Sequence, residues 1–451
     1  MLRRMRVAPL VAAAISLAAV TFSTAAHSNG RAAGANQLVV GPNSELTLRM
    51  TFGLLLADDA GKWRWVCESA VGYGGIQDPA IGIMSDKTII AGLFTGLSHS
   101  AVDRCSWTFV PGDLDNQVVS DVTVRKDDPK SAFAVTCTYD GGGGANPQYK
   151  VQLHSTSDNG ASWKTIGTPL PRNAFVETLE VAPSRPSRLY VSAALVEAPL
   201  HGVVYTTDDT GATWSATDVN LLASDGGNVE KALYIAAVDP ADPDRVYART
   251  GGDGPTRLLV SENGGKTWAE RIKLKGQMLG FALAPDGKRV YVGGPQDGIL
   301  VASTTDWQFT QTATIQVDCL TAHAMGLYAC SNEANGFVLG LSGDEGKTFK
   351  TLLHFADIQG PLACATEAGA QCSSEWPALR DRLGASLDPD AGSLSDAGSG
   401  SDASGPGGPK PGGSGCACNM THGGQRGASL IALTTAALVV FLRRKTRRSA
   451  R

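Results

Sequence analysis

The sequence predicts an all-β fold built from repeated four-stranded sheets, and three observations carry that prediction. A short motif ending in an aromatic residue occurs seven times at intervals of roughly 40 to 56 residues, which is typical of a repeat architecture. Apolar runs with period-2 alternation lie between the copies, as expected for strands. Turn-forming residues are abundant, with 53 Gly and 22 Pro among 451 residues.

Four copies of the motif share the pattern Ser/Thr-x-Asp/Asn-x-Gly-x-Ser/Thr-aromatic. The side chain at the third place is expected to bond backbone N–H groups two residues on, and the Gly at the fifth place is expected to have φ > 0. The aromatic ring starts the next strand and can bury about 150–250 Å² between neighbouring sheets. The structural residues of the four copies are Thr156, Asp158, Gly160 and Trp163; Thr207, Asp209, Gly211 and Trp214; Ser261, Asn263, Gly265 and Trp268; and Ser342, Asp344, Gly346 and Phe349.

The motif resembles the Asp-box, or bacterial neuraminidase (BNR) repeat, of sialidase-like and sortilin-like β-propellers. Three worn copies, Asp58–Trp63, Ser100–Trp107 and Ser303–Phe309, bring the number of units to seven between about Gln37 and Gly384. Each unit has about the 40–50 residues of one propeller blade. The resemblance implies a seven-bladed β-propeller over residues 37–384. Six or eight blades would follow if one worn copy is spurious or if one blade lacks the motif.

A second pattern describes the start of each blade, where an apolar strand, a Pro turn and a strand with a Tyr follow one another. Its copies are Leu179–Val191, Ala236–Tyr247 and Phe281–Val292. The first strands, Gln37–Val40 and Glu45–Thr51, are expected to complete the last blade and so close the ring. A short helix is possible around Trp376–Leu383.

Both ends of the chain read as export and anchoring signals. Residues 1–26 combine arginines, an apolar run and small residues, as in a cleaved signal peptide, with a retained membrane anchor as the alternative. Residues 385–415 form a Gly/Ser/Asp/Pro linker that is expected to be disordered. Residues 416–451 hold Cys416 and Cys418, an apolar run at about 427–442 and a basic end.

This tail resembles the MYXO-CTERM sorting tails of myxobacterial surface proteins. The resemblance implies anchoring or processing at the cell surface, with Cys416 or Cys418 modified or cleaved nearby. A plain C-terminal transmembrane anchor remains the alternative, because a charged cluster after an apolar segment is what a membrane-spanning helix also shows.

An exported protein meets an oxidising compartment, so its cysteines can pair. Cys319 and Cys330 flank a predicted hairpin and are expected to face each other. Cys364 and Cys372 enclose a short loop and form a second candidate pair. Cys67 and Cys105 flank the first repeat and form a third candidate pair, which leaves Cys137 without a partner cysteine.

Residue types give little support to catalysis. The resemblance to sialidases would require three arginines, a Tyr nucleophile with a Glu partner and an acid/base Asp. The Phe/Tyr-Arg-Ile-Pro motif of that family is missing, and Leu48–Thr51 is its nearest approach. No paired-His spacing, complete calcium loop or phosphate loop is present, so we expect no metal, no cofactor and no catalytic residues.

The function expected from these features is binding or scaffolding at the cell surface. The net charge of −4 and the lack of a basic stripe argue against nucleic acid as a partner. We therefore expect a monomeric, non-catalytic propeller that binds a protein, peptide or glycan through uneven Gly-rich loops such as 139–147 and 224–228. An exo-acting glycoside hydrolase of sialidase type is the alternative, and a structural spacer in an outer coat is a third reading.

Overall fold

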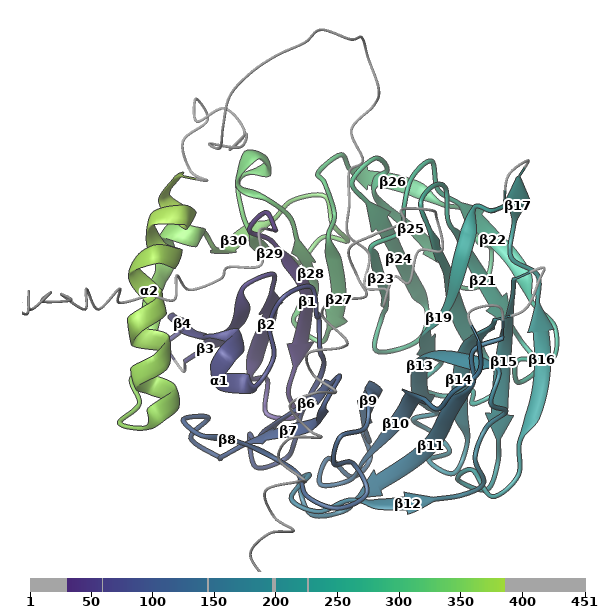
Figure 1. Cartoon of the computed structure of the whole chain (residues 1–451). Helices are drawn as coiled ribbons and strands as arrows, with labels where there is room; N and C mark the ends of the chain where they lie inside the picture. Colours follow the sequence, from purple (N-terminus) through teal and green to yellow (C-terminus); the bar gives the residue numbers. More distant parts are fainter. Residues whose placement is uncertain (1–30, 59, 144–145, 197–199, 225–226, 386–451) are drawn as a thin grey trace, which may run out of the picture. The chain divides into compact units, whose positions relative to one another are not determined.

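The computed structural model describes residues 31–385 except for Asp59, 144–145, 197–199 and 225–226. The predicted signal peptide, linker, Cys416, Cys418 and transmembrane segment lie outside the described residues. Seven antiparallel sheets of four strands follow one another along the chain and stand around a common centre (Figure 1). The seven-bladed β-propeller is confirmed.

Within each sheet the strands pair in chain order, so the first strand of a blade is the innermost and the fourth is the outermost. The first three blades have the following strands: β1 (Ala35–Val40), β2 (Leu46–Met50), β3 (Gly53–Ala57) and β4 (Trp63–Val66); β5 (Ala80–Ile83), β6 (Ile89–Leu93), β7 (Gly96–Ser100) and β8 (Trp107–Phe109); β9 (Val119–Val124), β10 (Ala132–Tyr139), β11 (Tyr149–Thr156) and β12 (Lys164–Ile166).

The fourth and fifth blades are separated by a small extra hairpin, β17 (Ala223–Ser224) with β18 (Gly227–Asn228). Their strands are β13 (Ala174–Val181), β14 (Leu189–Leu195), β15 (His201–Thr207) and β16 (Ser215–Val219), then β19 (Glu230–Val238), β20 (Val246–Gly252), β21 (Arg257–Ser261) and β22 (Ala269–Lys273).

The sixth and seventh blades complete the circle. Their strands are β23 (Gly280–Leu283), β24 (Arg289–Gly294), β25 (Gly298–Ser303) and β26 (Thr310–Ala313), then β27 (Cys319–His323), β28 (Gly326–Cys330), β29 (Leu339–Ser342) and β30 (Lys350–Leu353). Short 3₁₀ turns lie at Glu333–Asn335 and Phe355–Asp357, and a short helix, α1 (Glu68–Val71), links the first blade to the second.

Apolar packing between successive blades forms the core. The Tyr residues of the Pro-turn pattern take part in it: Tyr190 of blade 4 shares a buried cluster with Leu233 and Ile235 of blade 5, and Tyr247 shares one with Val290 of blade 6. Tyr190 and Tyr247 are fully buried. Burying a side chain of this size stabilises the fold by about 2–3 kcal/mol. The repeated Tyr therefore fills space between two successive blades and stabilises their contact.

The ring closes differently from the sequence-based expectation. Gln37–Val40 and Glu45–Thr51 do not complete the last blade, because β1 and β2 pair with β3 and β4 in a separate first blade. The chain itself crosses the seam between blades 7 and 1, because the segment after β30 returns to the first blade. The seam also includes hydrogen bonds from Thr321 Oγ1 to the Leu38 carbonyl at 3.0 Å and from Trp63 Nε1 to the Leu352 carbonyl at 3.0 Å.

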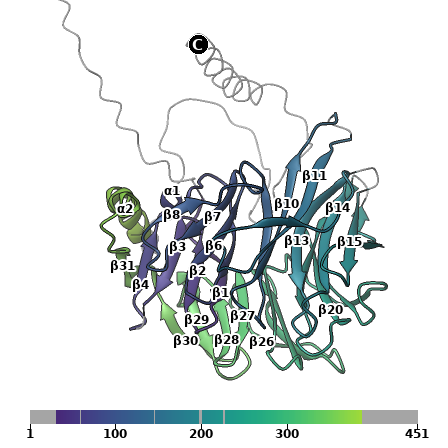
Figure 2. The same cartoon turned by 90° about the horizontal axis from the view of Figure 1, so that it is seen from below.

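The C-terminal part of the described chain returns to the first blade. Strand β31 (Ile358–Pro361) pairs in parallel with the outer strand β4, so this sheet gains a fifth strand. Helix α2 (Glu367–Ala385) then packs against α1 and β31 at the edge of the ring (Figures 1 and 2). The helix expected at Trp376–Leu383 is thus real but much longer, with 19 residues.

Candidate functional site

The four well-kept motifs form the same turn between the third and fourth strands of their blades. In the blade 4 copy, Thr207 Oγ1 accepts the backbone N–H of Asp209 at 3.2 Å and that of Gly211 at 2.9 Å. The Asp209 carboxylate accepts the N–H of Thr213 at 2.9 Å and its hydroxyl at 2.7 Å. The Asp209 carboxylate therefore bonds an N–H four residues further along the chain, and not two as expected. The bond between groups two residues apart is made by the Thr207 hydroxyl instead.

Two successive residues in each turn have a left-handed backbone. The Gly at the fifth place has φ between 82° and 86° in all four copies, as expected. The fourth place, which the sequence pattern leaves open, is left-handed too, at Asn159, Thr210, Gly264 and Glu345. An added Cβ on Gly211 would lie 3.0 Å from Leu153 of the preceding blade. The fifth Gly thus serves both the turn and the close approach of two blades.

The aromatic residues occupy corresponding chain positions but differ in burial. Trp163 is buried, whereas Trp214, Trp268 and Phe349 are half-buried. The indole N–H of Trp163 bonds the Gly160 carbonyl at 3.0 Å, and that of Trp268 bonds Gly265 at the same distance. Trp214 instead reaches Thr168 at the end of the preceding blade, at 3.1 Å. These residues hold turns and blades together, which is a structural role.

The three worn copies lie at the same place in their blades. Asp58–Trp63 joins β3 to β4, Ser100–Trp107 joins β7 to β8, and Ser303–Phe309 joins β25 to β26. In the first of these, Asp58 Oδ1 still accepts the N–H of Lys62 at 2.8 Å. Every blade therefore has a motif turn at the same end, and these turns mark one face of the ring.

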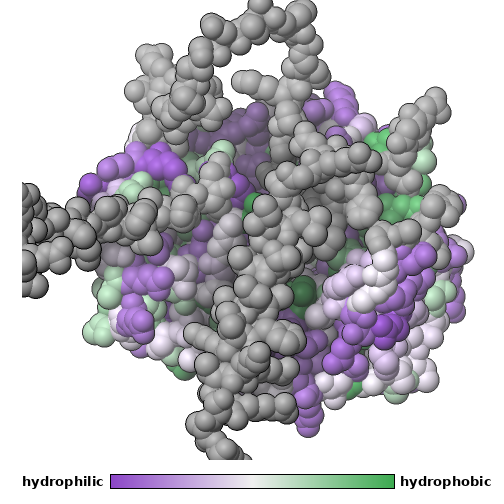
Figure 3. Space-filling view, viewed as in Figure 1, coloured by the Kyte–Doolittle hydropathy of each residue, from purple (hydrophilic) through white to green (hydrophobic). Residues whose placement is uncertain are grey.

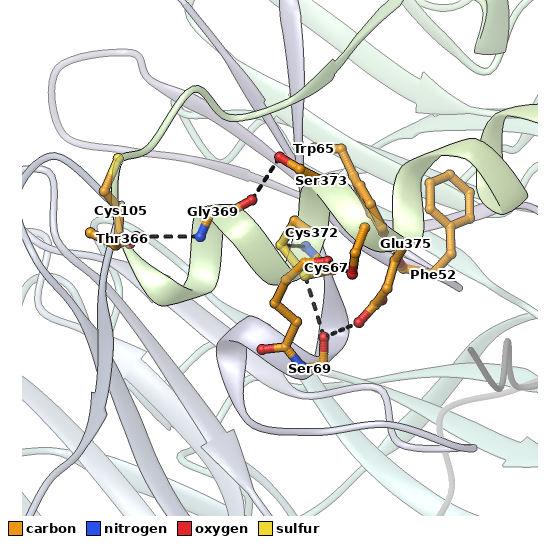
Figure 4. The surroundings of a disulfide bond; sticks show 12 residues. Phe52, Trp65, Cys67, Ser69, Cys105, Thr366, Gly369, Cys372, Ser373 and Glu375 are labelled. Carbon is orange, nitrogen blue, oxygen red and sulfur yellow. Dashed lines mark hydrogen bonds between the residues drawn. A yellow bond between two sulfur atoms is a disulfide. The ribbon is translucent and has the colours of Figure 1, made fainter. Parts of the chain in front are cut away.

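The disulfides form a clasp between the C-terminal segment and the first two blades (Figure 4). Cys67 is bonded to Cys372 and Cys105 to Cys364. Pairing of Cys364 with Cys372 and of Cys67 with Cys105 is therefore wrong. The sequence-local pairs are not made because β31 and α2 carry Cys364 and Cys372 back to the first two blades.

The remaining cysteines behave as their positions in the predicted strands indicate. Cys319 and Cys330 face each other across β27 and β28 and are bonded. Cys137 is a buried thiol outside these disulfides, and its sulfur accepts the N–H of Val176 at 3.5 Å. Three disulfides indicate an exported protein, because such bonds persist in oxidising compartments.

The opposite face carries the connections between second and third strands and between blades. Here the β10–β11 hairpin extends beyond its neighbours, and an open hollow of about 330 Å³ lies between blades 3 and 4. It is lined by Asn146, Pro147, Gln148, Arg172, Asn173 and Val196. In Figure 2 the β10–β11 hairpin and α1 stand at the same end of the ring. We call this end the loop face.

Backbone hydrogen bonds hold the walls of the hollow. Gln148 N–H bonds the Gly141 carbonyl at 2.7 Å, and Tyr149 N–H bonds the Arg172 carbonyl at 2.7 Å. The Arg172 guanidinium pairs with Asp140 at 2.9 Å. Beside it, the ring of Tyr139 is 55% exposed and meets that of Tyr149 edge-on at 6.2 Å. This is the part of the 139–147 loop that the sequence singled out.

The central strands bring together carboxyl groups that the sequence analysis did not nominate. Burial raises the pKa of Asp121 on β9 to about 7, although the N–H groups of Leu179 and Val122 oppose the shift. Burial raises the pKa of Glu177 to about 8, and burial together with the nearby Asp121 raises that of Glu180 to about 8. Glu177 lies at a β-bulge of β13, which alters the alternation of side chains there.

Arginines reach these carboxyl groups from the second strands, because Arg49 lowers the pKa of Asp121 and Arg249 lowers that of Glu177. Within the described chain, none of the seven innermost strands contains an arginine. Arg49 on β2 is buried and donates to the Pro79 carbonyl at 2.7 Å, whereas Arg249 on β20 lies over the ring of Tyr234 at 4.5 Å. No group of three or more metal-ligating side chains occurs among the residues that the structure describes. Nor does this part of the chain contain a helix long and apolar enough to cross a membrane.

Comparisons with known proteins concern the fold. No family model matches the sequence, and no curated protein matches it. Among solved structures, an ancestral GH74 enzyme matches with 13% identity and a TM-score of 0.48, over 70% of this chain and 46% of that chain. The chain therefore spans about half of that enzyme.

Two further structures are propellers of other kinds. The β-propeller domain of Myceliophteria thermophila Cps50 (Swd1) matches with 8% identity and a TM-score of 0.45, over 68% of this chain and 95% of that one. The structure of YCF48 bound to D1 peptide matches with 14% identity and a TM-score of 0.35, over 54% of this chain and 68% of that chain. At such identities these likenesses say nothing of activity or ligand.

Proposed function

We propose that this protein is a non-catalytic, ligand-binding propeller displayed at the cell envelope, with its loop face as the binding surface. The observation that carries the proposal is the hollow between blades 3 and 4, where polar side chains converge from two separate loops, the β10–β11 hairpin and the connection from β12 to β13. Concave surfaces with a few convergent polar groups are the usual form of ligand sites. The motif turns occupy the other face and serve the fold.

Attachment to the envelope is the part of this proposal that rests on the sequence. The signal-like start, the Gly/Ser/Asp/Pro linker and the Cys416–Arg451 tail support it, and the disulfides agree with export. Mass spectrometry of the mature surface protein tests it. A C-terminus that ends near Cys416 or Cys418 supports processing, whereas an intact Arg451 supports a plain membrane anchor.

A glycoside hydrolase is the second candidate, because Asp121 and Glu180 are neighbouring carboxyl groups with raised pKa values. A general acid in a glycosidase has a raised pKa, but its partner must be ionised to act as nucleophile or base. Here burial raises the pKa of both groups, to about 7 for Asp121 and about 8 for Glu180, so neither carboxyl group is fully ionised at neutral pH. A sialidase site would need three arginines that converge on the carboxylate of a sialoside. None of the described inner strands carries an arginine, and Arg49 and Arg249 act on Asp121 and Glu177 from second strands.

Two assays separate the candidates. Purified protein is incubated with a fluorogenic sialoside and with a panel of fluorogenic neutral glycosides, and it is also tested for binding to immobilised glycans and displayed peptides. Binding without turnover supports the proposal. Turnover that disappears in Asp121→Asn or Glu180→Gln, or a sialidase activity lost in Arg49→Ala or Arg249→Ala, would overturn it in favour of the hydrolase.

A further inference from the structure

The hollow between blades 3 and 4 has side chains whose hydrogen-bonding groups have few or no partners among the described residues. Asn146, Gln148 and Asn173 each offer a carboxamide, which provides two N–H donors and one acceptor oxygen. In the described part of the chain, the carboxamides of Asn146 and Asn173 make no hydrogen bond. That of Gln148 makes only a long one of 3.4 Å, to the adjacent Pro147 carbonyl. These groups are free to bind a ligand.

The charge of the hollow is balanced. Arg172 is the single charged residue in its lining, and its guanidinium is paired with the Asp140 carboxylate and also donates to the Asp140 carbonyl at 3.1 Å. An anionic ligand would have to compete with Asp140, and a cationic one would meet Arg172. The chemistry of the hollow therefore favours a ligand without net charge.

Apolar anchoring is weak in the same place. Pro147 and Val196 are the two apolar residues in the lining, and neither forms a deep pocket for an aromatic or aliphatic side chain. Peptide and protein partners usually depend on such buried anchors. The surface around β11, β14 and β15, at the lower right of Figure 3, is mainly hydrophilic as well. A hydroxyl-rich ligand fits this surface better than an apolar peptide does.

Hydrogen bonds hold the described residues that flank the hollow in place before any ligand arrives. Asp140 N–H bonds the Gln148 carbonyl at 2.8 Å, and Val196 N–H bonds the Asn173 carbonyl at 3.2 Å. The Tyr139 hydroxyl donates to the Gly142 carbonyl at 2.5 Å and so ties the ring to its own loop. Less conformational freedom is then lost on binding.

Building on the proposed binding function, we propose that the hollow between blades 3 and 4 binds a neutral saccharide. The carboxamides of Asn146, Gln148 and Asn173 hydrogen-bond its hydroxyl groups, and Arg172 adds fixed N–H donors. The ring of Tyr139, which is 55% exposed at the loop end of β10, offers apolar surface to the C–H side of a sugar ring. A volume of about 330 Å³ is at the lower end of the size range of ligand pockets, which suits a short segment of a longer chain.

The test is a calorimetric titration of the propeller with cellotetraose, maltotetraose and tetra-N-acetylchitotetraose, beside a sialylated and a sulfated oligosaccharide. We expect one neutral oligosaccharide to bind and the charged ones to bind less well. Gln148→Ala and Asn173→Ala should each weaken that binding roughly tenfold, as expected for the loss of one or two hydrogen bonds. Gln308→Ala, an exposed amide on the opposite face, is the matched control and should bind unchanged.

Melting curves of each variant show whether a loss of binding follows from unfolding. Binding that survives both hollow variants would overturn the saccharide site while leaving a binding function elsewhere on the protein. Displayed peptides that bind the wild type but not Gln148→Ala, with no oligosaccharide bound, would show that the hollow binds peptide. A protein that binds neither class would contradict this inference and the proposed function together.

Discussion

Removing the disulfide clasp should cost far more stability than removing the hairpin disulfide. The Cys67–Cys372 bond spans 305 residues and Cys105–Cys364 spans 259, whereas Cys319–Cys330 spans 11. In the chain-entropy model, a bond across about 300 residues stabilises the fold by about 6 kcal/mol, and one across about 11 residues by about 3 kcal/mol.

The two clasp bonds are not independent, because they close nested rings. With one already formed, the second closes a ring of only about 46 residues, the difference between the two separations. In the same model, closing a ring of that size stabilises the fold by about 4 kcal/mol. Each pair of substitutions, Cys67→Ala with Cys372→Ala or Cys105→Ala with Cys364→Ala, should therefore cost about 4 kcal/mol, and all four together about 10 kcal/mol.

The assay is guanidinium unfolding followed by tryptophan fluorescence. Trp65 of β4 and Trp376 of α2 are 5.8 Å apart between ring centroids, so their emission should report release of α2 from the first blade. Cys137→Ala, which removes a buried thiol without a disulfide, is the control for lost packing. If the four-cysteine variant is destabilised no more than a Cys319→Ala/Cys330→Ala variant, the reasoning from ring closure is wrong.

Three further predictions concern the turns and the central strands. The bonds of the Asp209 turn hold the pKa of that carboxyl down to about 2, so its stabilising effect is complete above the ordinary Asp pKa and is lost as the pH falls from about 4 to 2. Asp209→Asn, which copies the natural Asn263, should reduce this acid sensitivity in pH-dependent melting, whereas equal sensitivity in both proteins would contradict the argument. Gly211→Ala places a side chain at φ 86° and should cost about 1–2 kcal/mol in urea unfolding, with Gly343→Ala, which has open space around its Cβ, as the control of little effect. Because burial raises the pKa of Glu177 to about 8, the folded state keeps a proton that the unfolded state has lost, and stability should decrease as the pH rises from about 4 to 8. Glu177→Gln should flatten this decrease in melting temperature, and an unchanged pH profile would show that Glu177 is ionised in the folded protein.

The fold was predictable because its signal is local and repeated. A turn such as Thr207–Trp214 closes through its own side chains and backbone, so the residues that form it are adjacent in the sequence. The same holds for the Pro-turn and Tyr of blades 4, 5 and 6, and for Cys319 and Cys330, which belong to one hairpin. Counting the seven motif copies, with the three altered ones included, was then enough to predict seven sheets.

What the sequence could not decide depends on residues brought together from distant parts of the chain. Cys67 meets Cys372 because β31 and α2 return to the first blade, and spacing along the chain favoured nearer partners. Asn146 and Asn173 share a hollow because adjacent blades place their loops side by side, although neither belongs to a motif. Asp121 and Glu180 come together through the packing of two inner strands, and burial there shifts their pKa values. The sequence by itself determined the repeating blade and its turns, because their bonds are short-range, whereas the closure of the ring and the surface available to a ligand were decided only by the tertiary structure.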